Sequence, residues 1–185
     1  MKVIQYLLGR GILGEREDIV FQVGQLIVYG NTGVCRVEKI GPPDLVGAAE
    51  GVDYYTLSPY YSKNSRIFTP CDNDKVVMRP VISKREAKKL VDDIPEIELL
   101  CIVDEKSREE RYKETMRSCD CREFVSIIKT IYERKLQRLA EGKKVTASDE
   151  KYYNMAEDKL YGELAIALEM DKVKVKEYIK EKVES

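Results

Sequence analysis

The spacing of apolar residues changes once along the chain. Before about residue 82, short apolar or β-branched runs are separated by glycine, asparagine and proline, a pattern typical of strands joined by turns. The clearest runs are Leu26 to Tyr29 and Val34 to Ile40. Between them lies Gly30-Asn31-Thr32-Gly33, and because glycine and asparagine tolerate positive φ, this segment predicts a tight hairpin.

The same region contains further strand candidates. Gly41-Pro42-Pro43 should end the second run, because proline can neither donate to a strand ladder nor continue it. Three later runs fit short strands, with Asn64-Ser65 as turn residues: Tyr54 to Leu57, Arg66 to Thr69 and Val76 to Met78. Short strands at this spacing predict a small, strongly bent antiparallel sheet or barrel.

From Ser83 onward the apolar residues recur with helical spacing. Ser83 and Glu86 have the spacing of a capping box, so a helix should begin there, and it should end before Pro95. Similar signals predict further helix starts at Ser107 with Glu110, at Asp120 with Glu123, at Ser148 and at Asp171.

The apolar stripes on these predicted helices are expected to form a core. The clearest stripe comprises Phe124, Ile127, Ile128, Ile131 and Leu136, and Gly142 is its predicted C-terminal stop. The predicted fold class is therefore α+β, with a bent antiparallel β domain followed by a helical bundle. The predicted boundaries are residues 1–19 for an N-terminal extension, 20–82 for the β domain and 83–185 for the helical domain.

Composition narrows the class of protein. Hydrophobic residues make up 43% and charged residues 35% of the 185 residues, which is typical of a soluble globular chain. No apolar run approaches the roughly 18 residues that a membrane span needs. The first residues are apolar, but Arg10 and nearby glycines interrupt them and no convincing cleavage site follows. We therefore expect a cytoplasmic protein without membrane contact.

Several kinds of chemistry are missing from the sequence. The chain has no histidine, which removes the commonest general base at neutral pH and every Ser-His-Asp or Cys-His arrangement. Its five cysteines are expected to be reduced thiols, and Cys119-x-Cys121 lacks the second pair or the histidines of a zinc site. No cofactor and no metal are expected. Adjacent Asp92 and Asp93 leave open an enzyme with carboxylate chemistry, which a deep polar pocket would favour.

Residues 21–34, which read FQVGQLIVYGNTGV, resemble the opening of the N-terminal domain of the CarD family of bacterial transcription regulators. That domain is Tudor-like or SH3-like and is shared with the polymerase-binding module of the transcription-repair coupling factor. Gln25 and Gly30 stand where the family usually has an acidic residue and a proline. Ile67-Phe68-Thr69-Pro70 matches the family's later strand.

The helical half resembles the same family. Arg111-Tyr112-Lys113-Glu114 is similar to the family's Arg-Tyr-Lys run at the start of its helical domain, and residues 119–137 resemble the following helix. Residues 146–151 are similar to a helix cap followed by Glu-Lys. Residues 160–168, which include Gly-Glu-Leu-Ala, match a family signature. The resemblance therefore covers both predicted domains in the right order.

The resemblance implies a non-enzymatic regulator that docks on the β subunit of RNA polymerase. In the family, the β domain binds through an exposed strand edge, where strand addition depends on main-chain hydrogen bonds. The matching residues are Arg66, Ile67, Phe68, Thr69 and Pro70. The alternative interpretation of these residues is an ordinary half-buried edge strand.

The resemblance also implies contact with promoter DNA beside the opening bubble, and so an effect on open-complex stability. Many members wedge a tryptophan at the minor groove, but this chain has no tryptophan, and Arg108 aligns with that position. Residues 106–144 hold 12 Lys or Arg against 7 Asp or Glu, a local excess of +5. The candidates for phosphate or minor-groove contact are Arg108, Arg111, Lys113 and Lys151, each of which has a solvated surface charge as its alternative. The missing tryptophan motivates a second hypothesis, a polymerase-binding adaptor without direct DNA contact.

Overall fold

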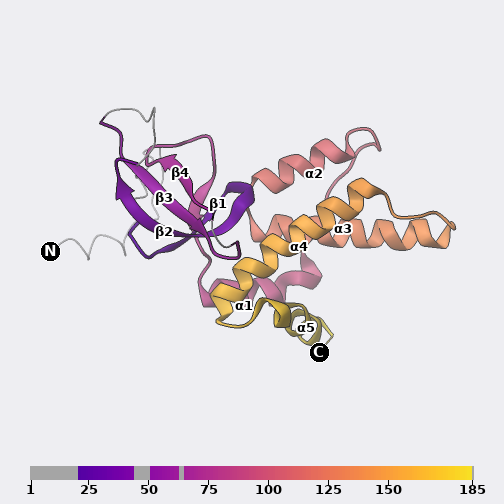
Figure 1. Ribbon diagram of the computed structural model, residues 1–185. Coiled ribbons are helices and arrows are strands. Elements are labelled where there is room, and N and C mark those ends of the chain that lie inside the picture. Colours follow the sequence, from indigo (N-terminus) through magenta and orange to yellow (C-terminus); the bar gives the residue numbers. More distant parts are fainter. Residues whose placement is uncertain (1–20, 44–50, 63–64, 185) are drawn as a thin grey trace, which may run out of the picture.

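The computed structural model describes residues 21–43, 51–62 and 65–184 of the chain. The predicted N-terminal extension at residues 1–19 and the predicted turn residue Asn64 lie outside the described residues. Within the described part, an antiparallel sheet is followed by helices, so the predicted α+β class with a Tudor-like β domain and a helical domain is confirmed (Figure 1).

The β domain is a five-stranded antiparallel sheet with strand order β4-β3-β2-β1-β5. The strands are β1 (Leu26–Tyr29), β2 (Gly33–Gly41), β3 (Tyr54–Pro59), β4 (Ile67–Pro70) and β5 (Met78–Pro80). A register shift between Val37 and Lys39 marks a bulge in β2, which bends the sheet. The last strand begins two residues later than the predicted Val76 to Met78 run and shares only Met78 with it. Proline is tolerated there because β5 is an edge strand.

The predicted hairpin between β1 and β2 is confirmed, with Tyr29 opposite Gly33 and a short 3-10 turn, η2 (Gly30–Thr32), between them. Positive φ values occur at Gly30 (43°) and Gly33 (86°), but Asn31 does not adopt one. A Cβ atom on Gly30 would lie 2.6 Å from a methyl group of Val76. Glycine is therefore required there for both backbone conformation and space.

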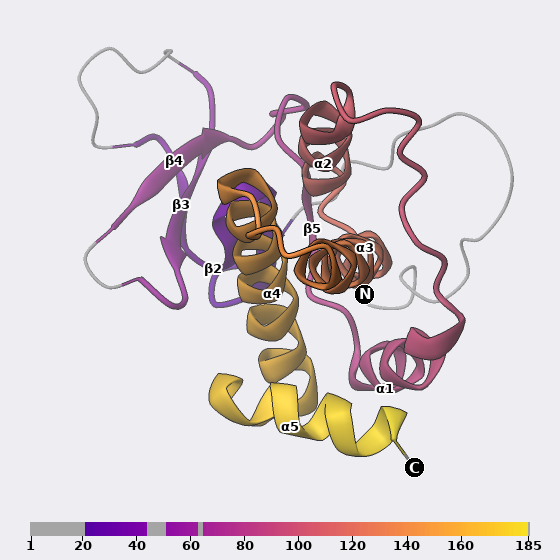
Figure 2. The ribbon, with the colours of Figure 1, turned by 90° about the vertical axis from the view of Figure 1, so that its right-hand side faces the viewer.

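The two faces of the sheet pack against different partners. One face holds the core of the β domain, which comprises Phe21, Ile27, Cys35, Val37, Tyr55 and Leu57. Val28 and Val34 alternate to the other face, where they line a small cavity together with Phe124 and Glu163 of the helical domain. Figure 2 shows α4 (Ala147–Leu168) between the sheet and α3 (Cys121–Ala140). The sheet and the helices therefore pack directly against each other, and we call this interface between the two domains the seam.

The helical domain has a single core that is centred on α4. The remaining helices are α1 (Lys84–Asp93), the 3-10 turn η3 (Ile94–Glu96), α2 (Arg108–Arg117) and α5 (Lys172–Val183). Most residues of the predicted inner stripes are buried or partly buried in this core. Leu136 is an exception at 50% exposure, because the C-terminal end of α3 extends beyond the bundle (Figure 1). No helix among the described residues is long and apolar enough to cross a membrane.

The predicted helix caps were right in some places and wrong in others. Ser83 forms a complete capping box with Glu86, and the side chain of Asp120 accepts backbone N–H groups at the start of α3. Ser107 makes no capping hydrogen bond, because it has helical dihedrals and its hydroxyl group donates to the carbonyl of Asp104 at 3.1 Å. Ser148 was also a wrong prediction: the extended Thr146 caps α4, and Ser148 lies inside its first turn.

Candidate functional site

Strand β4 forms one edge of the sheet and pairs only with β3 among the described strands. The N–H of Cys71 donates to the carbonyl of Asp53 at 2.9 Å, which makes these two residues a hydrogen-bonded pair. Hydrogen-bonded and non-hydrogen-bonded pairs alternate along an antiparallel ladder, so the Phe68–Thr56 pair is non-bonded. The N–H and C=O of Phe68 therefore point away from β3, toward the open edge.

The side chains of β4 divide between the two faces of the sheet. Ile67 packs against the core of the β domain, and Thr69 is buried and accepts a 2.7 Å hydrogen bond from Asn73. Phe68 and Pro70 alternate to the opposite face and are half-buried. Arg66 is exposed and forms a 3.2 Å ion pair with Glu38. The five predicted polymerase-binding residues thus occupy one sheet edge, with two anchored inward and an exposed cation at the beginning.

Three of the four predicted DNA-binding residues are solvent-accessible cations on α2 and the first turns of α4, where Arg111 and Lys113, two positions apart, project from the two flanks of α2. Tyr112 of α2 and Tyr152 of α4 pack with ring centroids 5.4 Å apart, which brings the two helices together. Lys151 lies 5.1 Å from the Tyr152 ring, and Glu109 contacts both Tyr152 and Lys113. We call Arg111, Lys113 and Lys151 the α2–α4 basic face.

The cations of the α2–α4 basic face have weak partners. Arg111 lies 3.4 Å from Glu114, and Lys113 lies 3.5 Å from Glu110, with all four side chains more than two fifths exposed. Ion pairs of this exposure are worth roughly 0–1 kcal/mol, since solvent screens them. These cations can therefore exchange a carboxylate for an external anion at little cost.

Two family models match the chain, one over the β domain and one over the helical domain from α2 onward. The CarD-like/TRCF RID domain matches residues 21–82, and the CarD C-terminal domain matches residues 102–180. The chain belongs to the CarD family. It is a transcription regulator that interacts with RNA polymerase, and the proteins of this family are regulatory. No curated protein matches the chain.

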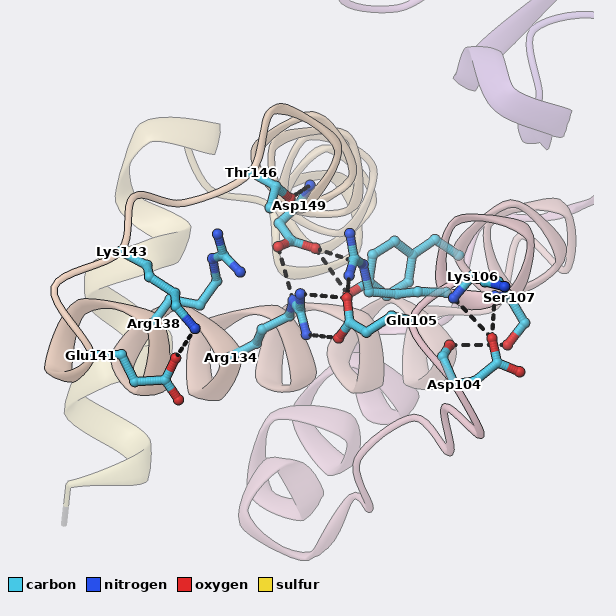
Figure 3. A network of polar contacts seen from close by, with 12 residues as sticks. Asp104, Glu105, Lys106, Ser107, Arg134, Arg138, Glu141, Lys143, Thr146 and Asp149 are labelled. Carbon is cyan, nitrogen blue, oxygen red and sulfur yellow. Dashed lines mark hydrogen bonds and ion pairs between the residues drawn. The ribbon is translucent and has the colours of Figure 1, made fainter.

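Arg108, which aligns with the wedge tryptophan of many CarD proteins, is placed differently from the other three candidates. Its side chain is 12% exposed and pairs with Glu105 and, at 3.2 Å, with Asp149. Arg134 of α3 binds the same two carboxylates, at 2.8 Å from Glu105 and 3.0 Å from Asp149 (Figure 3). The Arg108 guanidinium is thus held inside the helical domain of this CarD protein and does not reach out to solvent.

The carboxylate of Asp149 is the centre of this network and was missed in the sequence. It is 2% exposed and receives two arginines and, at 3.3 Å, the hydroxyl group of Tyr112. Burial and the charge of Asp149 raise the pKa of Tyr112, so its hydroxyl group stays a donor. The available signal was an aspartate one turn from an aromatic residue on the inner face of α4. That signal indicates a buried charge without naming its partners.

The remaining candidates from the sequence do not assemble a catalytic or metal site in the described part of the CarD chain. Asp92 is exposed, whereas Asp93 pairs with Lys89 and Arg122 at the rim of a 560 Å³ cavity. Hydrogen bonds from these two cations lower the pKa of Asp93, which makes it a poor proton acceptor. Cys119 and Cys121 are buried free thiols, and the described residues contain no cluster suited to a metal ion.

Proposed function

We propose that this CarD-family regulator binds the β subunit of RNA polymerase through the open edge of β4. The observation that carries the proposal is the direction of the Phe68 backbone groups, which face away from β3. Unpaired main-chain groups on an edge strand are a template for strand addition by a partner. The inward anchoring of Ile67 and Thr69 holds this edge extended, so it is ordered before the partner arrives.

The second part of the proposal is that the α2–α4 basic face contacts promoter DNA near the opening bubble. Arg111, Lys113 and Lys151 are suited to phosphate contact, which is strong at low salt and carries no sequence information. Arg108 takes a supporting role, because it holds α2 against α4 through Glu105 and Asp149. An indole-like wedge is therefore not part of the proposed contact.

The two contacts together act on the promoter equilibrium. A protein that holds polymerase and DNA at once favours whichever promoter state allows both contacts. Couplings of this kind are typically about 1–3 kcal/mol, which corresponds to changes of about fivefold or more in complex lifetime. We expect the protein to modulate the stability of the open complex.

Binding measurements on the purified protein test this function. The proposal predicts binding to the cognate polymerase and to its isolated β subunit, together with weak, salt-sensitive binding to DNA alone. Binding to neither the β subunit nor a forked promoter–polymerase complex would contradict it.

A second candidate function is an adaptor that binds polymerase without touching DNA. The burial of Arg108 favours it, because the position that carries a wedge in relatives is used internally here. Charge reversal by Arg111→Glu with Lys113→Glu separates the two functions. A changed effect on open-complex lifetime supports DNA contact, and an unchanged effect supports the adaptor. Lys174→Glu with Lys180→Glu on α5 is the matched control for the change in net charge.

A further inference from the structure

Glu163 is a charged residue at the seam between the β domain and the helical domain. It lies on α4, is 2% exposed and accepts hydrogen bonds from both sides of the seam. Arg79 of β5 donates to its two oxygens at 2.5 and 2.7 Å, and the N–H of Ile82 donates at 3.0 Å. The thiol of Cys121, at the start of α3, lies 3.2 Å from one oxygen. One carboxylate therefore joins a strand, a linker and two helices.

Arg79 reaches a second group of the helical domain. Its guanidinium donates to the carbonyl of Cys119 at 3.0 and 2.5 Å. Cys119 has φ of 54°, a left-handed conformation that a residue other than glycine adopts at a cost. This conformation lies in the turn between α2 and α3, where the carbonyl of Cys119 meets Arg79. Burial opposes the charge on Arg79, but the hydrogen bonds and charge of Glu163 outweigh it and raise its pKa.

Three other contacts cross the seam, two from α4 residues within about one turn of Glu163 and one from α5. The Lys159 ammonium donates to the carbonyl of Thr32 at 3.1 Å, and the hydroxyl of Tyr61 donates to the carbonyl of Gly162 at 2.8 Å. Lys172 lies 4.6 Å from the Tyr61 ring. A Cβ atom on Gly162 would lie 3.0 Å from that ring, so the approach is close. None of these three contacts is bidentate, whereas Arg79 donates to both oxygens of Glu163.

The Arg79–Glu163 pair is better suited to fixing the relative orientation of the two domains than to raising the stability of the fold. Burying two charges costs desolvation energy, and apolar replacements of similar volume are often as stable as the ion pair. A bidentate arginine–carboxylate pair, in contrast, is satisfied in only one relative orientation of its partners. Packing of Val28 and Val34 against the helices has no such directional requirement.

We propose that Arg79 and Glu163 form a clamp that fixes the orientation of the β domain on the helical domain. The proposal rests on the proposed function in one respect: the clamp sets the position of the β4 edge relative to the α2–α4 basic face. Strand β4 lies at the edge of the sheet opposite β5, which carries Arg79 (Figure 2). A rotation at the seam therefore displaces the β4 edge relative to the helices. Arg79 and Glu163 are positioning residues and touch neither partner.

The test compares the full chain with the double variant Arg79→Met, Glu163→Met. The two methionines remove both charges and fill similar volume, so the variant is expected to fold. Glu163→Gln is the second variant, which keeps the shape of the side chain if the double variant does not fold. Glu169→Gln is the matched control, because Glu169 pairs with Lys84 at 2.7 Å within the helical domain.

Domain orientation is measured by pulsed electron paramagnetic resonance. Nitroxide labels are placed on cysteines introduced at the exposed positions Ser65 and Gln137, on opposite sides of the seam. Cys71 and Cys101 are replaced by serine, since they are the native cysteines that are not buried. The same proteins, without labels, are assayed for binding to the β subunit and for open-complex lifetime.

The clamp predicts a narrow label distance in the parent and control proteins and a broad one in the clamp variants. It further predicts unchanged affinity for the isolated β subunit but a loss of about fivefold or more in the lifetime effect. A folded clamp variant with the parent's narrow distance would overturn the proposal, as would a broad distance with an unchanged lifetime effect. If the parent protein itself leaves the lifetime unchanged, the proposed function fails, and the label distances alone then decide whether the clamp sets orientation.

Discussion

The β4 edge and the α2–α4 basic face offer different groups to a partner. At the β4 edge the groups are backbone N–H and C=O, whose direction is set by the ladder with β3. On the α2–α4 face they are cationic side chains on a surface that Tyr112 and Asp149 hold together from beneath. Backbone contacts tolerate changes of side chain and of salt, whereas charge contacts tolerate neither. The two surfaces should therefore respond to different perturbations.

The largest expected effect is on the support of the α2–α4 basic face. Asp149→Ala removes the buried one of the two carboxylates that Arg108 and Arg134 share and leaves them only the exposed Glu105. Removal of one partner from a buried ionic network typically costs about 3–5 kcal/mol, so the free energy of unfolding should fall by that order. Urea unfolding measures it. The exposed pair of Glu169 is the control: if Glu169→Gln destabilises the chain as much, the Asp149 network has no special role.

The next effect separates backbone from side chain at the β4 edge. Phe68→Pro removes an N–H that faces the open edge, so β4 should still pair with β3. Phe68→Ala keeps that N–H and removes the ring. Loss of a backbone hydrogen bond in a buried interface costs about 1–3 kcal/mol, so Phe68→Pro should weaken binding to the β subunit about tenfold. Titration calorimetry measures both affinities. If Phe68→Ala bound the β subunit more weakly than Phe68→Pro, the ring rather than the backbone N–H would dominate the contact.

Salt distinguishes the two surfaces with a smaller effect. The logarithm of the DNA-binding constant should fall linearly with the logarithm of salt concentration, and each phosphate contact contributes a slope of about −0.9. Arg111→Gln and Lys113→Gln should each reduce that slope by about 1 and weaken binding to all sequences alike. Binding to the β subunit should change little over the same range. Equal salt dependence of DNA binding and of β-subunit binding would contradict the distinction between the two surfaces.

The smallest expected effect is on how the free energy of unfolding depends on pH in the acid range. Hydrogen bonds from Arg134 lower the pKa of Glu105, and Arg108 adds to this shift. The folded pKa of Glu105 lies below its unfolded value of about 4.3. The contribution of Glu105 to the free energy of unfolding is therefore fully present above about pH 4.3 and is lost as the pH falls through the folded pKa. The free energy of unfolding should therefore decrease less between about pH 5 and pH 3 in Glu105→Gln than in the parent. Glu98→Gln, which removes one exposed carboxylate outside this network, is the control for the change in net charge.

Local features of the fold were predictable from the sequence, because a few neighbouring residues determine them. The Ser83 capping box, the Asp120 cap and the β1–β2 hairpin are of this kind. The cap at Thr146 was missed because two hydroxyl residues lie within three positions, and only backbone dihedrals decide which one is extended. The Ser107 cap failed for a related reason, because Ser107 has helical dihedrals and its hydroxyl group donates to the carbonyl of Asp104.

Long-range features of the candidate site were harder to predict. Strand order makes β4 an edge, and neither periodicity nor turn residues determine strand order. Arg108 was predicted to contact DNA, with a solvated surface charge as the alternative, because its partner Asp149 lies in another helix, far along the chain. Glu163 did carry a signal, since it lies beside Leu160 and Leu164 of a buried stripe and a charge there requires a partner. The sequence alone does not reveal that this partner is Arg79.

The central claim is that one molecule uses both surfaces at once, and a double-mutant cycle on open-complex lifetime tests it most directly. The cycle combines Phe68→Pro at the β4 edge with Arg111→Glu and Lys113→Glu on the α2–α4 basic face. Because a tether depends on both of its ends, the account predicts that each change alone removes most of the lifetime effect and that their combination removes little more. Additive losses, or a full lifetime effect after charge reversal on the α2–α4 basic face, would contradict the account.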